Sequence, residues 1–322
     1  MCFVAEKKGR AGVFRLLLYS CGGIIGLVAA VSLFGSIATA QVLEPSGSGH
    51  VDWTKQYIEA TGLASFWEYA AENATDIPSD AILRRGAAMH ARRQLLRSLK
   101  HLRVDGEHRL RDLWAANTGL RQAVYGLAHA PEVETGAGEE NTQTVRLAFG
   151  GRLLEVLGPS QSRWGSADAL ARPSVGNATQ PYTGLIVDAR DVALQPALFP
   201  RVYGEQGEVL YGPGRVQAQA ARQEGMAVYV HSMAAALEHP RVGRRPEVLK
   251  AFSVQGKLAT NAVVLAPKQD LVQLVPALQH ARVVFVLGQR DENARDNATS
   301  EGPRAEVPQK TDSSEVEEFE LR

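Results

Sequence analysis

The strongest constraint on this chain is an uncharged, apolar stretch from Leu16 to Leu43 that follows a basic amino end. A helix needs about 20 apolar residues to cross a bilayer, so this stretch is long enough to span one. It contains Ala38-Thr39-Ala40, the small-x-small pattern of a signal-peptidase site. Cleavage after Ala40 predicts a soluble exported protein, whereas retention predicts a single anchor with its basic end in the cytoplasm. Both alternatives place residues 44 onward outside the cytoplasm, in the periplasm or on the membrane facing it.

The cysteines and the charge balance exclude several classes of protein. Cys2 and Cys21 are the only cysteines, so the exported part has no disulfide framework, thiolate nucleophile or cysteine-zinc site. The segment "LYSC" ending at Cys21 resembles a lipoprotein cleavage box, but Tyr19 is too large for that pattern, which disfavours lipidation at Cys21. Lys plus Arg equal Asp plus Glu at 35 each, so no overall charge attracts nucleic acid, and we expect no nucleic-acid partner.

Local patterns predict an α+β fold, with a small α+β amino-terminal domain followed by a mixed α/β domain. Pro-, Gly- and Ser-rich stretches indicate linkers, and the polar carboxyl end indicates disorder. The predicted organisation is a signal peptide or anchor at 1–43, a linker at 44–50, a first domain at 51–160, a linker at 161–181, a second domain at 182–288 and a disordered tail at 289–322.

Within the first domain, a short strand is expected after residue 50. A helix is expected from about Ser79 to Arg103, with the apolar stripe Ala88, Ala91, Leu95, Leu99 and Leu102. A second helical pattern follows over 110–127, then a turn-rich segment over 131–143 and a strand or hairpin over 144–157. In the second domain we expect a strand at 184–189, a hairpin at 200–212, a mostly helical stretch at 215–240, one or two strands at 248–266, a helix to Ala281 and a last strand at 282–287.

A dense group of basic residues is the best candidate for an interaction surface. Nine Lys and Arg residues lie between Arg84 and Arg111, and Arg93, Arg97 and Lys100 fall on the helix side opposite the apolar stripe. Such a face is either simply solvated or binds an anionic partner, for which an acidic protein, lipid headgroups and an anionic envelope polymer are alternatives.

Asp188 and Arg190, at the end of the predicted strand 184–189, form a second candidate for an interaction surface, on the sheet edge from Asp188 to Tyr211. Residues two apart in a strand point to one face, so the two side chains can pair. A structural ion pair is the favoured interpretation, because no second acid, base or nucleophile is recognisable nearby. The alternative is an envelope hydrolase that uses Asp188 or Glu208 as a general acid or base.

No motif for catalysis, cofactor binding or metal binding is present. The histidines at 90, 101, 108 and 129 lack the HxxxH spacing of a metal site, and there is no P-loop, strand-linked GxGxxG or GxSxG. We therefore predict a protein without cofactor, metal or catalytic residues.

Three segments, "DWTKQYIEATGLA", "AAMHARRQLLRSLKHLRVDGEHRLRDLWAANTGLRQAVYGLA" and "TVRLAFGGRLLEVLG", together resemble the Lpp-twenty lipoprotein family and the related N-terminal domain of flagellar assembly protein T. The similarity covers about a third of the chain. The matching positions are Ala60-Thr61-Gly62, the helix from Ala87 to Leu102, the turn from Val104 to Gly106, Gly126, Val145 and Leu147.

The segments "GLIVDARD" and "PALFPRV" are similar to a region that follows this domain in some Gram-negative envelope proteins, although Asp191 stands where Gly is usual. The resemblance implies an exported, membrane-associated envelope protein that acts as an interaction or scaffold module with envelope or flagellar proteins as partners. It brings no catalytic residues. An anionic-lipid-binding protein and the hydrolase are the alternatives.

Overall fold

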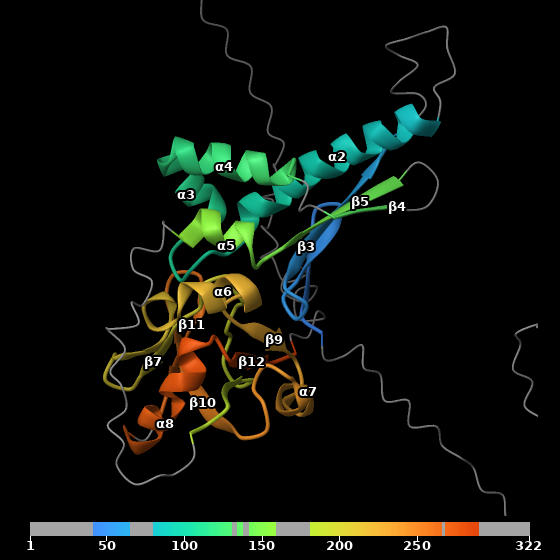
Figure 1. Ribbon diagram of the computed structural model, residues 1–322. Coiled ribbons are helices and arrows are strands. Elements are labelled where there is room, and N and C mark those ends of the chain that lie inside the picture. The colour runs from blue at the N-terminus through green and yellow to red at the C-terminus, as the bar shows by residue number, and fades with distance from the viewer. Residues whose placement is uncertain are drawn as a thin grey trace, which may run out of the picture. The chain divides into compact units, whose positions relative to one another are not determined.

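The computed structural model describes residues 41–64, 80–130, 134–137, 142–158, 181–265 and 268–289 (Figure 1). Residues 1–40 of the predicted leader, nearly all of the predicted linker 161–181 and the tail beyond Gln289 lie outside these ranges. Among the described residues, no helix combines the length and the apolarity that crossing a bilayer requires. The described chain confirms the predicted fold class, an α+β amino-terminal part followed by a mixed α/β part.

The amino-terminal part contains a five-stranded antiparallel sheet in the order β1-β2-β3-β5-β4. Its strands are β1 (Leu43–Ser46), β2 (Gly49–Asp52), β3 (Tyr57–Leu63), β4 (Glu134–Ala137) and β5 (Thr142–Ala148). Its helices are α2 (Asp80–His101), α3 (Leu110–Ala116), α4 (Thr118–Ala128) and α5 (Arg152–Leu157).

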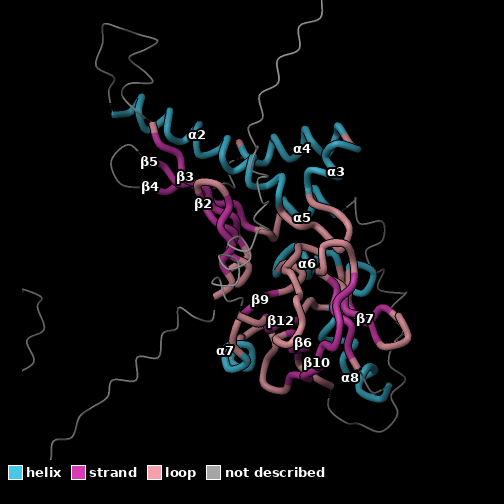
Figure 2. Tube along the Cα trace, turned by 180° about the vertical axis from the view of Figure 1, so that it is seen from behind, coloured by secondary structure: helices cyan, strands magenta, loops and turns pink. Residues whose placement is uncertain are grey.

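Helix α2 packs along β3 and β5, as both views of the chain show (Figures 1 and 2). Apolar residues spaced three and four apart bury one side of it, and Ala91, Leu95 and Leu99 are fully enclosed. The predicted stripe is thus confirmed at these positions, whereas Ala87 rather than Ala88 is buried next to the sheet. The close approach depends on Gly62 of β3, because a Cβ there would overlap the backbone of Ala87 and Ala91.

The predicted linker at 44–50 is wrong, because these residues form most of the β1–β2 hairpin. Pro, Gly and Ser serve a tight turn as well as a linker, and here Gly47 adopts the left-handed φ of +60°. Gly49 lies so close to the carbonyl of Glu59 that no side chain fits. The expected single strand after residue 50 is therefore two strands, β2 and β3.

Three other elements differ from their sequence patterns. The single helix expected over 110–127 is two helices, separated at Asn117, whose extended backbone ends α3 and whose side chain accepts from Leu120 N at 3.0 Å to cap α4. The turn-rich segment over 131–143 contributes strand β4. The strand or hairpin expected at 144–157 is β5 followed by helix α5, with Gly151 at a φ of +59° between them.

The carboxyl-terminal part is a seven-stranded mixed sheet in the order β8-β7-β11-β10-β6-β12-β9. Its strands are β6 (Gly184–Ala189), β7 (Val202–Gly204), β8 (Val209–Tyr211), β9 (Val228–Val230), β10 (Pro246–Gln255), β11 (Asn261–Val264) and β12 (Val283–Leu287). The helical elements are η3 (Pro213–Arg215), α6 (Ala218–Glu224), α7 (Met233–Glu238) and α8 (Lys268–Gln279). Strand β6 runs parallel to both of its neighbours, β10 and β12.

The β7–β8 hairpin, the buried strand β12 and the split of 248–266 into β10 and β11 agree with the sequence patterns. The stretch 215–240 was expected to be mostly helical, and that expectation is wrong at β9, an edge strand between α6 and α7. Val228, Tyr229 and Val230 are all buried, so the strand has no polar alternation that would distinguish it from a buried helix segment.

One hydrophobic core extends through both parts, from α2 and β3 to β6 and β12. Hydrogen bonds reinforce it where the β2–β3 turn meets β9, because Thr54 Oγ1 donates to Tyr229 O at 2.6 Å and Gln56 donates to Ala227 O. Leu198 N and Phe199 N donate to Arg103 O and Val104 O at 3.0 and 2.8 Å.

Candidate interaction surface

The solvent side of α2 carries one continuous stripe of side chains, which we call the α2 stripe: Ile82, Gly86, Met89, Arg93 and Arg97. These residues recur at intervals of three and four, so they share one side of the helix, and all of them are exposed. The stripe is exposed because α2 packs its opposite side on the sheet, while α3 and α4 contact α2 beside the stripe, where Leu96 is buried. Its amino-terminal half is apolar, with Ile82 and Met89 45% and 50% exposed, and its carboxyl-terminal half is cationic.

Neither Arg93 nor Arg97 lies within ion-pair distance of a carboxylate among the residues that the structure describes. Exposed arginines without a partner retain donors in a planar fork that fits a carboxylate or phosphate. The structure thus leaves these two predicted interaction residues accessible.

Lys100, the third predicted residue of this face, is differently placed. Its Nζ lies 5.5 Å from the centre of the Trp114 ring, which is buried and packs edge-on against Tyr125. A cation above an aromatic face is attracted to it, so Lys100 helps to hold α3 against α2. Lys100 thus has a partner within the fold, whereas Arg93 and Arg97 are the two residues of the predicted basic face on which the candidate surface centres.

Asp188 and Arg190 pair as predicted, although Arg190 lies in the turn after β6 and not in the strand itself. Arg190 Nε donates to Asp188 Oδ1 and Nη2 donates to Oδ2, both at 2.8 Å, while Lys250 Nζ lies 2.7 Å from Asp191. These hydrogen bonds from Arg190 lower the pKa of Asp188, and burial opposes them without cancelling them. A carboxylate held in its charged form by a bidentate arginine is a poor general acid, so the geometry fits a structural pair at the carboxyl end of β6.

The other candidate residues, Glu208 and the histidines, are not brought together into a site among the residues that the structure describes. Glu208 accepts from Gln206 N at 3.1 Å and lies over Gly204, so it stabilises the β7–β8 turn. Within the described ranges no group of three or more His, Cys, Asp or Glu side chains is arranged to hold a metal ion.

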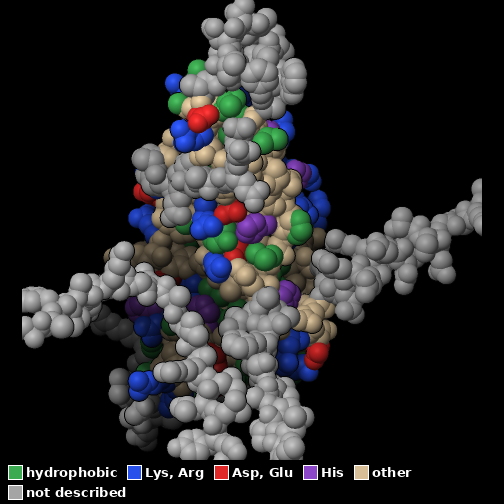
Figure 3. Space-filling model, turned by 90° about the vertical axis from the view of Figure 1, so that its right-hand side faces the viewer, with side chains coloured by type: hydrophobic (Ala, Val, Ile, Leu, Met, Phe, Trp, Pro, Cys, Tyr) green, Lys and Arg blue, Asp and Glu red, His purple; other side chains and the backbone are tan. Residues whose placement is uncertain are grey.

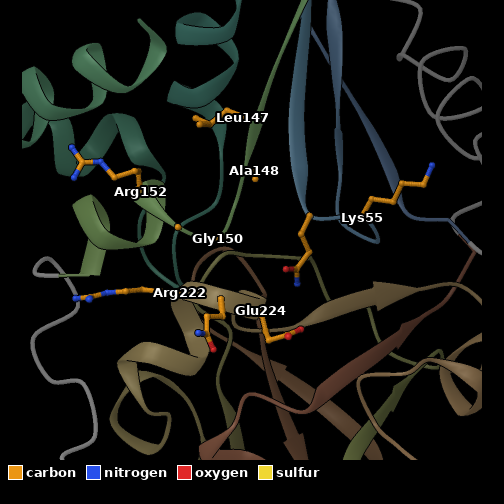
Figure 4. Close-up of a pocket in the computed structure, with 10 residues that line it drawn as sticks. Lys55, Leu147, Ala148, Gly150, Arg152, Arg222 and Glu224 are labelled. Carbon is orange, nitrogen blue, oxygen red and sulfur yellow. The ribbon is translucent and has the colours of Figure 1, made fainter. Parts of the chain in front are cut away.

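A pocket of about 480 Å³ lies between the β2–β3 turn, the start of α5 and the end of α6 (Figure 4). Its charged lining residues include Lys55, Arg152 and Arg222, and the labelled side chains of the two arginines extend to one side of it while Lys55 extends to the other. Because Lys55 points away from the two arginines, these charged side chains do not indicate a ligand of a particular chemical class, and we assign no ligand to this pocket. On the face in Figure 3, basic, acidic, histidine and apolar side chains are mixed, in keeping with the chain's balanced charge.

Arg103 is the important residue whose position sequence reasoning missed. It belongs to the basic group between Arg84 and Arg111, but its side chain is buried where the two parts meet. Its Nε donates to Pro196 O at 2.7 Å, its Nη1 donates to Glu44 Oε1 at 3.0 Å, and its other amino group also binds Glu44. Trp53 Nε1 donates to the same carboxylate at 3.0 Å. The sequence contained one indication of this burial: Arg103 lies four residues after Leu99, which lies four after Leu95, so it continues the buried side of the predicted helix.

The fold and the surface together define a two-part α+β protein: an antiparallel sheet with its helices, joined by a common core to a mixed α/β sheet. A family model for the second domain of Tp0624 from Treponema pallidum matches residues 184–290, which extend from β6 through β12. A search of curated proteins found no match.

Proposed function

We propose that this protein is an exported bacterial envelope protein that acts as a non-catalytic interaction or scaffold module, in flagellar or surface-structure assembly. The α2 stripe is the observation that carries the proposal. It offers apolar side chains beside two accessible guanidinium groups, a combination that fits an acidic protein segment with apolar anchors. The leader at 16–43 and the resemblance of residues 52–158 to the Lpp-twenty family support an envelope location.

The test is capture of envelope proteins by the purified full chain, comparing the wild type with Arg93→Glu/Arg97→Glu. Reversing the two charges should weaken capture, and the residual capture should rise with salt where that of the wild type falls, because the long-range attraction becomes a repulsion that salt screens. Arg121→Glu/Arg222→Glu is the matched control, since it makes the same change of charge at two exposed arginines of α4 and α6. Equal capture by all three proteins would exclude the α2 stripe as the contact surface.

Two further measurements separate the alternatives. An anionic-lipid binder predicts that the wild type binds vesicles of phosphatidylglycerol, and that the binding falls steeply with salt. A hydrolase predicts a specific activity that Asp188→Asn alone abolishes while the protein stays folded. Either result would replace the scaffold proposal.

A further inference from the structure

The first residues that the structure describes, Gln41 and Val42, are built into the fold. Gln41 forms an antiparallel bridge with Val230 of the edge strand β9. Val42 is 5% exposed, its N–H donates to Thr54 Oγ1 at 2.8 Å, and its carbonyl accepts from Trp53 N at 3.0 Å. The ordered fold therefore includes the residue directly after the small-x-small motif.

The side chain of Gln41 is also fixed, because its amide donates a hydrogen bond to Asp52 Oδ2. Asp52 is completely buried, and its other oxygen accepts from Thr54 N and Lys55 N at 3.0 and 2.8 Å. A buried carboxylate needs a donor at each oxygen, and the Gln41 amide supplies one at Oδ2.

We propose that cleavage after Ala40 makes Gln41 the mature amino terminus, and that Asp52 preserves it there as an uncyclised glutamine. The inference rests on the export part of the proposed function and not on the α2 stripe. Cleavage at this bond removes the whole leader and leaves every contact of Gln41 and Val42 described above in place.

The chemistry explains why the Asp52 contact matters. In a free amino-terminal glutamine, the α-nitrogen attacks the side-chain carbonyl carbon, a new C–N bond closes a five-membered lactam, and the amide nitrogen leaves as ammonia. Ring closure requires the side chain to turn back toward its own amine. In this fold that movement would break the hydrogen bond to Asp52 and take a donor away from a buried carboxylate.

The first experiment locates the amino terminus. The full chain with its leader is produced in a Gram-negative host, and the protein from each cell fraction is analysed by Edman sequencing and intact mass. We expect a periplasmic protein that starts at Gln41 and is open to Edman degradation. Ala40→Leu should block processing, whereas Thr39→Leu should not, because only the outer positions of the motif must be small.

The second experiment measures cyclisation of the mature protein as loss of one ammonia by mass spectrometry. The folded protein should cyclise at least about tenfold more slowly than the same protein in urea, and than a synthetic peptide of residues 41–50. Asp52→Ala, checked for folding by circular dichroism, should cyclise at close to the peptide rate. If the Asp52→Ala protein does not fold, the cyclisation rates of the wild type with and without urea still test whether the fold protects Gln41.

The outcomes are distinguishable from those of the proposed function. A cytosolic protein would overturn both proposals. An exported protein that keeps its leader, or that starts at another residue, would overturn this inference alone. Equal cyclisation rates in the folded protein and the peptide would overturn the role of Asp52.

Discussion

Arg103 shows how one residue joins distant segments of this chain. Its guanidinium contacts Glu44 of β1 and the carbonyl of Pro196, and it lies over the Trp53 ring at 5.7 Å. Replacing Arg103 by Met removes these hydrogen bonds. Pro196 O and the Glu44 carboxylate then lose the donors that Arg103 provides.

We expect Arg103→Met to lower the free energy of unfolding by about 3 kcal/mol, near the lower end for a broken buried pair, because Glu44 remains partly exposed. Urea denaturation measures the change. Arg97→Met, on the exposed α2 stripe, should change stability by less than about 0.5 kcal/mol. An equal loss in both variants would argue against this structural role of Arg103.

Glu44 gives a pH dependence with a definite sign. Burial alone would raise its pKa, but the hydrogen bond and charge of Arg103, with help from Trp53 and Arg109, bring the pKa below its usual value of 4.5. A carboxyl group with a lowered pKa in the folded state stabilises the protein above its unfolded pKa, and this contribution is lost as pH falls through the folded pKa.

The stability difference between the wild type and Glu44→Gln should therefore be largest near neutral pH and should shrink as pH falls below about 4.5. Urea unfolding curves across that range provide the measurement. A difference that stays constant with pH would mean that the charge of Glu44 contributes nothing.

At the scale of elements, the packing of α2 on β3 depends on the missing side chain of Gly62. A Cβ at this position would overlap the backbone of Ala87 and Ala91, which cannot move as a flexible side chain can. Gly62→Ala should therefore destabilise the protein by about 1–3 kcal/mol.

Gly126 provides the opposite case within the same part of the molecule. It lies in α4, where a Cβ would point into open space, so Gly126→Ala should stabilise the protein by about 0.5–1 kcal/mol through helix propensity. Thermal unfolding of the two variants should move in opposite directions. Destabilisation by Gly126→Ala would show that this glycine has a role other than flexibility.

For the molecule as a whole, the continuous core predicts that residues 41–158 and 181–289 unfold together. A protease site inserted between residues 159 and 180 tests this, since after cleavage the two fragments should elute together from a sizing column and melt in a single transition. Adding Arg103→Met should let the fragments separate at a lower urea concentration. Two fragments that separate without denaturant would refute the shared core.

Local sequence predicted those elements whose pattern is set by their own residues. The buried side of α2 follows from helical spacing over 22 residues, and β12 follows from an unbroken run of apolar side chains. The pairing of Asp188 with Arg190 is confirmed, but for another reason than a shared strand face: β6 ends at Ala189, and Arg190 reaches back to Asp188 from the turn that follows. Strand β9 has three residues, all buried, and such a segment has no period by which to recognise it.

The fold class, the buried side of α2 and the accessible positions of Arg93 and Arg97 could be derived from the residues alone, because spacing fixes which side chains share a face. Only the tertiary structure shows three other features: the hairpin at 44–50, the burial of Arg103 and the contact between Asp52 and Gln41. Those outcomes depend on contacts with other elements, such as Glu59 of β3 for Gly49 and Pro196, 93 residues away, for Arg103, and the pattern within one segment does not record them.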